Sequence, residues 1–295
     1  MSKTILITGS TSGIGKALAI YLAKQNHHVL VCSRSIEKVN QVVQEIKSLN
    51  GSAEGFQLDL IDLESVKRFC DSLSVKIDVV VLNAGITTRE LEFSPQGIEA
   101  TFATNHLGHF YLTERLLLNN DLERVIVVSS GTHDPKSGSG VDPPVFDLER
   151  WATPKEHYGS SVYSSTKLAN VLFGYNLAER RPDVVVTSYD PGFIGDTGLL
   201  RDLGMLQPVL KVVIETTLAV TSWWKGVRNQ TSTLDRTIPF LAKLTVDPQY
   251  SKTAKYYSID VELKSSDISY EKEKQRALYD FSLKLLHEKG FEITK

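Results

Sequence analysis

From residue 4 to about residue 190, short runs of Val, Ile and Leu alternate with longer stretches in which apolar residues recur at helical spacing. This alternation is typical of βαβ units, which place parallel strands side by side in a sheet covered by helices. We expect six strands in this part of the chain and a last strand further on, at Thr4 to Thr8, Val29 to Cys32, Gly55 to Leu58, Asp78 to Leu82, Val125 to Val128, Val184 to Tyr189 and Ala254 to Ile259.

The helical stretches between the strands have recognisable ends. Ser35 and Asp62 stand where a helix N-cap is needed. Longer helices are expected over Gln96 to Asn119 and over Tyr158 to Arg180, and a charged helix ends near Leu286. Because no stretch rich in Pro, Gly and Ser divides the sequence, residues 1–295 are predicted to form a single domain.

Composition excludes several classes of protein without choosing one. The 295 residues are 41% hydrophobic and 23% charged with a net charge of −2, which is typical of a globular protein and argues against a broad nucleic-acid surface. Two cysteines, Cys32 and Cys70, are too few for a disulfide framework or a metal cluster. No apolar stretch of signal-peptide length lies at the N-terminus, so we expect a cytoplasmic protein.

A glycine-rich turn joins the first strand to the first helix. It reads Thr8-Gly9-Ser10-Thr11-Ser12-Gly13-Ile14-Gly15. Such a turn lets backbone N–H groups approach a pyrophosphate at the positive end of a helix. A plain turn without a ligand can share the pattern, but the position directly after a strand favours a dinucleotide site. We therefore predict that Gly9, Ser10, Thr11, Ser12, Gly13, Ile14 and Gly15 bind the cofactor phosphates.

The end of the second strand selects between the two nicotinamide cofactors. An acidic residue there bonds the adenosine ribose, whereas a basic one accommodates a 2′-phosphate. The sequence reads Cys32-Ser33-Arg34, which favours NADP(H), unless Arg34 is only a solvated surface residue. Asp59 and Leu60 close the third strand and are expected at the edge of the adenine pocket, although Asp59 is equally suited to a turn.

Candidate catalytic residues follow the later strands, at the edge where open α/β sheets bind ligands. Tyr163 and Lys167 are spaced to lie one turn apart on the same face of a helix. A cation held near a phenol lowers its pKa from about 10 and makes it a better acid/base. Ser130 is suited to bind the substrate oxygen as negative charge develops. Tyr270 and Lys274 repeat the spacing in a charged helix, which we interpret as a solvated face.

These motifs together resemble one family. The ordered set is Thr8-Gly9-x3-Gly13-x-Gly15, Asn83-Ala84-Gly85, Asn105, Ser130, Tyr163-x3-Lys167 and Pro191-Gly192. It is similar to the motifs of the short-chain dehydrogenase/reductase superfamily over nearly the whole chain. The resemblance implies an α/β, doubly wound Rossmann fold with a seven-stranded, mostly parallel sheet and helices on both faces.

The resemblance also implies a role for each matching residue. Tyr163 would exchange a proton with the substrate oxygen, and Lys167 would hold the nicotinamide ribose and tune Tyr163. Ser130 would orient the substrate carbonyl, and Asn105 would support a proton-relay water near Lys167. Hydride would pass between nicotinamide and the substrate carbon. Further cofactor contacts are then expected from Asn83, Ala84, Gly85, Pro191, Gly192, Ile194 and Thr197.

Two local sequences narrow the resemblance. The run from Asn105 to Phe110 is similar to the retinol-dehydrogenase-like branch, and Pro191-Gly192-Phe193-Ile194 is similar to the protochlorophyllide reductases of that branch. Those reductases usually carry a cysteine where Phe193 stands, and a Thr where this chain has Asp196. Light-driven pigment reduction is therefore kept as a minor alternative.

Substrate identity is expected to depend on a loop at residues 131–157, which holds Trp151, and on an apolar lid at about residues 197–226. The apolar lid favours a bulky hydrophobic substrate, although such residues also pack on sheets or form homodimer contacts. Trp223-Trp224 could touch a membrane surface. His106 and His109 lack a third ligand, so no metal site is expected, and we predict one packed and one near-solvent ring.

The sequence thus predicts an NADP(H)-dependent oxidoreductase that interconverts a carbonyl and an alcohol on a retinoid-, steroid- or lipid-aldehyde-like substrate. Nucleic acid is not expected as a partner. The alternatives are a protochlorophyllide-type pigment reductase and a non-catalytic NADP-binding sensor or scaffold on the same fold.

Overall fold

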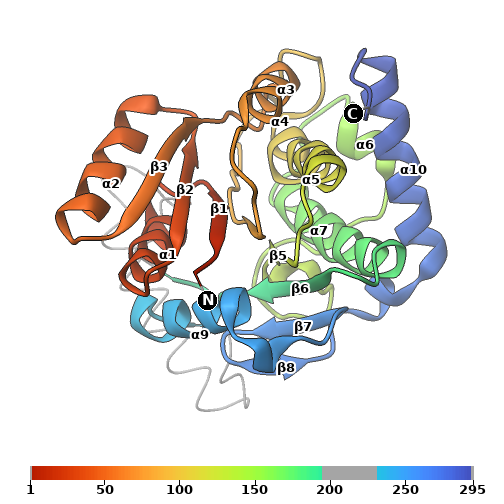
Figure 1. Ribbon diagram of the computed structural model, residues 1–295. Coiled ribbons are helices and arrows are strands. Elements are labelled where there is room, and N and C mark those ends of the chain that lie inside the picture. Colours follow the sequence, from red (N-terminus) through yellow and green to blue (C-terminus); the bar gives the residue numbers. More distant parts are fainter. Residues whose placement is uncertain (1, 195–230, 294–295) are drawn as a thin grey trace.

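The computed structural model describes residues 2–194 and 231–293, whose strands form one eight-stranded sheet in the order β3-β2-β1-β4-β5-β6-β7-β8 (Figure 1). The strands are β1 (Thr4–Thr8), β2 (His28–Ser33), β3 (Ser52–Gln57), β4 (Val79–Leu82), β5 (Arg124–Val128), β6 (Val185–Asp190), β7 (Lys255–Ser258) and β8 (Val261–Leu263). Neighbouring strands are parallel from β3 to β7, and β7 pairs with β8 in the antiparallel sense. The predicted doubly wound, mostly parallel sheet is confirmed.

One strand was not predicted from the sequence. β8 is three residues long and every one of them is exposed, so it carries no alternation of buried and exposed positions. The seven expected strands all form, with ends displaced by up to about three residues.

The longer helices are α1 (Gly13–Lys24), α2 (Ile36–Ser48), α3 (Leu63–Ser72), α5 (Gly108–Asn119), α7 (Ser161–Arg180), α9 (Leu234–Val246) and α10 (Lys272–Glu288). Shorter segments are α4 (Ala100–Phe102), the π-helix η1 (Ala103–Leu107), η2 (Gly131–His133), α6 (Leu148–Ala152), η4 (Pro248–Tyr250) and η5 (Asp267–Tyr270). The predicted N-caps are present: the Ser35 side chain accepts from Lys38 N–H, and the Asp62 side chain accepts from Glu64 N–H.

The expected helix from Gln96 to Asn119 begins four residues later. Gly97 N–H bonds back to Ser94 in a turn, and the Glu99 carboxylate then caps the helix by accepting from Phe102 N–H. From Ala100 onward α4, η1 and α5 follow one another without a break.

Alternate residues of the strands enter two cores, one on each face of the sheet. On β1, Leu6 packs with residues of α3, α5, α7 and α10, whereas Ile5 and Ile7 pack with residues of α1, α2 and α9. Figure 1 shows α10 alongside α7. The sheet is therefore covered by helices on both faces, as the nearly continuous apolar strands require.

The strand order reverses between β1 and β4, which are neighbours although two strands separate them in sequence. The carboxyl ends of parallel strands at such a point form the ligand-binding crevice of open α/β sheets. Among residues 2–194 and 231–293, no helix has the length and apolarity to cross a bilayer.

Candidate active site

The glycine-rich turn lies at this switch point, between β1 and α1. Backbone crowding requires glycine at Gly15, because a Cβ there would lie 2.5 Å from the Gly9 carbonyl oxygen and 2.6 Å from Asn83 Nδ2. Ser12 occupies the N-cap of α1, but its side chain makes no capping bond. Backbone N–H groups in the first turn of α1 therefore remain available to bind an anion.

The rest of the turn is held by its neighbours. Ser10 is fully buried, and its hydroxyl donates to the Ile7 carbonyl and accepts from Cys32 N–H. Thr11 Oγ1 donates to Ser33 Oγ over 3.0 Å, which ties the turn to the end of β2. The predicted phosphate residues from Gly9 to Gly15 are therefore brought together at one rim of the sheet.

A buried network joins this turn to the residues after β4. The Thr8 hydroxyl oxygen accepts from Asn83 N–H at 2.9 Å and Ala84 N–H at 3.0 Å, and it lies 2.8 Å from Nε2 of His109. Because the oxygen already accepts two bonds, the Thr8 proton is directed at Nε2. The other ring nitrogen, Nδ1, then donates to the Asn105 carbonyl at 3.1 Å. Burial lowers the pKa of His109 to about 4, so the ring is neutral, as this pattern needs.

Asn105 lies in the π-helix η1, where the chain departs from α-helical spacing. Its side chain is fully buried and pairs with both backbone groups of Ile86: Oδ1 accepts from Ile86 N–H at 2.8 Å, and Nδ2 donates to Ile86 O at 2.9 Å. Nδ2 also donates to Thr166 Oγ1 on α7. A Cβ added at Gly85 would lie 3.4 Å from Asn105 Oδ1 and 3.5 Å from Lys167 Nζ, so both groups border the same small space.

α7 is fastened to the end of β5 by polar contacts. Ser129 Oγ donates to the Lys167 carbonyl at 2.8 Å, and Lys167 Nζ donates to the Val128 carbonyl at 3.2 Å. Lys167 is 3% exposed. Ser130 follows directly and caps η2, its hydroxyl accepting from Thr132 N–H. The Ser130 hydroxyl is also near enough to the Tyr163 hydroxyl to lower the pKa of that phenol. The structure thus brings Ser130, Tyr163 and Lys167 to one place.

The pKa of Tyr163 is shifted in the opposite direction to the one expected from the sequence. Burial raises the pKa of Tyr163 well above its usual range, the Asp190 charge raises it further, and the nearby Ser130 hydroxyl opposes the rise. Burial lowers the pKa of Lys167 to about 8, against the attraction of Asp190. The expected lowering of the Tyr163 pKa is therefore wrong, because burial and the Asp190 charge together raise it by more than Ser130 lowers it.

Asp190 is the polar residue of this region that the sequence reasoning missed. It ends β6 directly before Pro191-Gly192 and is 5% exposed. Its oxygens accept from Gly192 N–H at 2.9 Å and from Ser258 Oγ on β7 at 2.8 Å. The available signal was an acidic residue at the end of a strand whose other residues are uncharged.

Arg34 and Asp59, which the sequence analysis expects near the adenosine of the cofactor, follow β2 and β3. Arg34 is exposed just after β2, and its carbonyl accepts from Gln57 Nε2. Asp59 is partly buried and makes a turn, since its Oδ1 accepts from Ile61 N–H and its N–H donates to Ser65 Oγ. Leu60 is buried.

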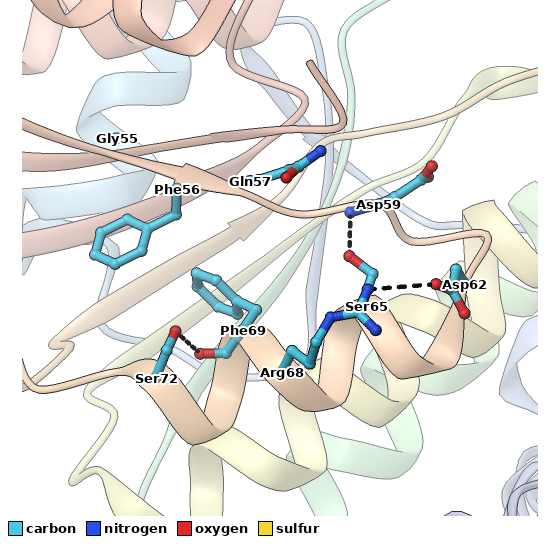
Figure 2. A pocket seen from close by; sticks show the side chains of 9 residues that line it. All are labelled: Gly55, Phe56, Gln57, Asp59, Asp62, Ser65, Arg68, Phe69 and Ser72. Atoms are coloured by element: carbon cyan, nitrogen blue, oxygen red, sulfur yellow. Dashed lines mark hydrogen bonds and ion pairs between the residues drawn. The ribbon is translucent and has the colours of Figure 1, made fainter. Parts of the chain in front are cut away.

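Asp59 also lines a cavity of about 490 Å³ between β3 and α3 (Figure 2). In Figure 2 the Phe56 and Phe69 rings lie at one end, and Asp62 with Arg68 at the other. Ser130, Tyr163 and Lys167 do not line it. A second hollow of about 260 Å³ adjoins the glycine turn and is lined by Thr11, Ser12, Lys16, Lys38, Gln41 and Val42.

The loop at residues 131–157 packs along α7. Ser161 Oγ donates to Pro143 O, and Ser164 Oγ donates to Asp142 O. Trp151 is fully buried, stacks obliquely near Phe102 and donates from its indole to Val145 O, so it is a core residue. Thr197 and the whole expected lid at 197–226 lie outside the described residues, whereas Ile194 is buried after the Pro191-Gly192 turn.

The histidine prediction is partly wrong. His106 and His109 are 1% and 2% exposed, so both rings are packed, His106 against Ser282 Oγ and His109 against Thr8. The second Tyr-x3-Lys pair is on the surface: Tyr270 is 46% exposed and stacks on Tyr175, while Lys274 pairs with Glu271. Tyr270 ends η5 and does not open α10.

Comparison with known proteins decides the family. The profile described as short chain dehydrogenase matches residues 3–139. The chain is 33% identical to short-chain dehydrogenase TIC 32 A, chloroplastic, of Brassica napus over 227 residues, covering 71% of this chain and 69% of that protein.

This chain belongs to the short-chain dehydrogenase family. It is therefore an oxidoreductase, as the motif order predicted.

Other relatives fall within the branch that the local sequences indicated. Retinol dehydrogenase 13 of Homo sapiens is 32% identical over 69% of this chain and 62% of its own length. Protochlorophyllide reductase, chloroplastic, of Chlamydomonas reinhardtii is 29% identical over 96% of this short-chain dehydrogenase and 78% of its own length.

Solved structures agree with the fold. A crystal structure of a protein from Mycobacterium paratuberculosis superposes with a TM-score of 0.72 at 26% identity, covering 99% of this chain and 95% of that one. A gluconate 5-dehydrogenase from Beutenbergia cavernae superposes with a TM-score of 0.66 at 23% identity over 88% of this chain and 95% of that one.

Proposed function

We propose that this short-chain dehydrogenase is an NADP(H)-dependent enzyme that interconverts a carbonyl and an alcohol on a bulky hydrophobic substrate. The observation that carries the proposal is the convergence of Ser130, Tyr163 and Lys167, from β5 and α7, beside the Pro191-Gly192 turn that follows β6. Each group alone is an ordinary polar residue, whereas together they form a proton donor with an adjacent cation and a second hydroxyl.

The residues present fit a nicotinamide dinucleotide. The glycine turn leaves backbone donors at the start of α1, and no Cβ can be placed at Gly15 without meeting the backbone of Gly9. The crowding at Gly15 is the close packing of the helix against the turn that the third glycine of a dinucleotide site allows. Gly9 to Gly15 would hold the phosphates, Asn83 to Gly85 and Lys167 the nicotinamide ribose. The bound cofactor would supply the hydride.

The proposed preference for NADP(H) rests on charge. Arg34 is exposed beside the glycine turn, where the 2′-phosphate of the cofactor would lie. Lys38 lines the adjoining hollow with Thr11 and is a further cation within the same region that the sequence analysis did not consider. Two cations and the absence of an acidic residue before Glu37 favour a phosphorylated ribose.

In carbonyl reduction, the chain's own residues supply the proton and hold the substrate oxygen. Ser130 and Tyr163 both offer hydroxyls to that oxygen as negative charge develops on it. Tyr163 is protonated at neutral pH, as an ordinary tyrosine is, and burial raises its pKa further, so it can donate. Lys167 is charged below about pH 8 and stabilises the phenolate left behind. The side chain of Asn105, which borders the same small space as Lys167, is fixed by its two bonds to the backbone of Ile86.

Support for a hydrophobic carbonyl substrate comes from the relatives. Proteins 32–34% identical to this chain include retinol dehydrogenases 13 and 14 and a daunorubicin C-13 ketoreductase. Retinol, which two of these names carry, is a long and largely apolar alcohol. The test is a panel of retinoid, steroid and long-chain aldehydes with NADPH or NADH. Turnover of the bulky aldehydes with NADPH is expected, and turnover confined to small polar carbonyls would contradict the proposed substrate class.

Pigment reduction is a second candidate, because the similarity to protochlorophyllide reductase extends over 96% of this chain. Phe193 stands where the sequence comparison expects a cysteine in those reductases. Light-dependent turnover of protochlorophyllide with NADPH would support this candidate over carbonyl reduction. The remaining candidate, a non-catalytic NADP-binding sensor, predicts cofactor binding with no turnover of any carbonyl.

A further inference from the structure

Asp190 is a buried acid that the proposed proton transfer does not use. It ends β6, and its side chain is almost wholly enclosed. Three bonds fix the residue: Ser258 Oγ donates to Oδ2 at 2.8 Å, Gly192 N–H donates to Oδ1 at 2.9 Å, and Ile259 N–H donates to the Asp190 carbonyl at 2.7 Å. Burying a carboxylate costs free energy unless it is hydrogen-bonded in this way. The three bonds therefore fix the position of Asp190.

The carboxylate also lies against the turn that carries Ser130. A Cβ added at Gly131 would lie 3.2 Å from Asp190 Oδ2. A methyl group at that position would require the carboxylate to shift by a few tenths of an ångström. Asp190 therefore joins three segments of the site: the Ser130–Gly131 turn, the Pro191-Gly192 turn and β7.

The charge of Asp190 acts on the two reacting groups of α7. It raises the pKa of Tyr163 and, by favouring the ammonium, partly offsets the lowering of the Lys167 pKa by burial. Among residues 2–194 and 231–293, the other titratable groups that face Asp190 are His133 on η2, Tyr256 on β7 and Tyr189 on β6.

Among the described groups that face Asp190, these neighbours leave Lys167, whose pKa is about 8, as the one that titrates near neutral pH. Burial lowers the pKa of His133, and its ring is held between the Ser130 carbonyl and Ser266 N–H. Burial raises the pKa of both Tyr256 and Tyr189. On the other side of Lys167, His109 is neutral because burial lowers its pKa to about 4.

We propose that Asp190 is a positioning residue of the oxidoreductase site, which anchors the Pro191-Gly192 turn to β7 and places a fixed negative charge beside Tyr163 and Lys167. The proposal rests on the proposed function for its role in catalysis. Its consequence is that the proton donor and its cation keep their protons to higher pH, which favours reduction of a carbonyl over oxidation of an alcohol in alkaline solution.

The direct test is an NMR titration of the free protein, which needs neither substrate nor turnover. Lysines are labelled with 13C at Cε, and the Lys167 signal is identified by its loss in Lys167→Met. Asp190→Asn keeps the shape and removes the charge, so the Lys167 midpoint, about 8 in the parent protein, moves to lower pH. Asp183→Asn, before the opposite end of β6, is the matched control and leaves the midpoint unchanged. An unchanged or higher midpoint in Asp190→Asn overturns the proposal.

A second variant separates charge from anchoring. Ser258→Ala removes the bond to Oδ2 but keeps the charge, so the Lys167 midpoint stays at the parent value or rises. A fall in Ser258→Ala overturns the proposal even if Asp190→Asn does not fold. With an active carbonyl substrate, the alkaline limb of kcat/KM moves to lower pH in Asp190→Asn alone. If no carbonyl is reduced, the proposed function fails while the NMR result still decides the role of Asp190.

Discussion

The Lys167 ammonium lies 5.4 Å from the centre of the Tyr163 ring and donates away from it, to the Val128 carbonyl. Tyr163 and Lys167 both lie on α7, and the bond to Val128 holds the ammonium against the end of β5. The helical spacing and this bond together set the distance between the cation and the phenol. Ser129 strengthens that docking through the Lys167 carbonyl.

This enclosure of Lys167 predicts an alkaline limit to carbonyl reduction. Burial lowers the Lys167 pKa to about 8, so the ammonium is present below that pH and is lost as pH rises through it. The loss removes the cation that stabilises the Tyr163 phenolate. A plot of kcat/KM against pH for an active aldehyde should therefore fall above about pH 8. A rate that stays flat to pH 10 would contradict this assignment.

Arg34 is predicted to select the cofactor. Arg34→Ala should reduce kcat/KM for NADPH by about 10–100-fold and leave that for NADH nearly unchanged, since one charge-assisted bond contributes about 1.5–3 kcal/mol. Arg276→Ala on α10, where the side chain is 71% exposed, is the control. Equal losses with both cofactors would show that Arg34 does not read the 2′-phosphate.

Asn105 is predicted to stabilise the fold as well as border the site. Asn105→Ala leaves both backbone groups of Ile86 without their buried partner, so the free energy of unfolding in urea should fall by about 1–3 kcal/mol. Asn40→Ala, on the exposed face of α2, should change it by less than about 0.5 kcal/mol. Equal stabilities of the two variants would rule out the structural role.

Trp151 provides a test of the substrate loop. Its side chain is fully buried against Phe102 and Phe146, so Trp151→Ala should lower the free energy of unfolding by about 3–5 kcal/mol. Phe93→Ala, at a ring that is 47% exposed, is the matched control and should change stability little. A Trp151→Ala protein of parental stability with altered substrate preference would instead place Trp151 in the pocket.

Much of the fold was predictable because its signals are local. The apolar strands, the Ser35 and Asp62 caps and the crowded Gly15 each depend on a few neighbouring residues. The order of motifs then located Ser130, Tyr163 and Lys167 at the carboxyl ends of the strands.

The missed features depend on distant partners or on enclosure. His109 is buried because it bonds Thr8, 101 positions away, and no local pattern encodes that contact. In the sequence, Asp190 resembles an ordinary turn residue. Its buried position becomes visible only from its contacts with Ser258 and Gly131 in the structure. The direction of the Tyr163 pKa shift was wrong because spacing shows a nearby cation but not the degree of burial.

The central claim is that Tyr163 donates the proton in a carbonyl reduction. The most direct measurement compares NADPH oxidation by the parent protein and Tyr163→Phe with an active hydrophobic aldehyde, while NADPH affinity is followed by fluorescence. We predict that kcat falls by about 100- to 10,000-fold and that NADPH affinity changes little, because the variant lacks only the phenolic hydroxyl. Full turnover by Tyr163→Phe would contradict the account.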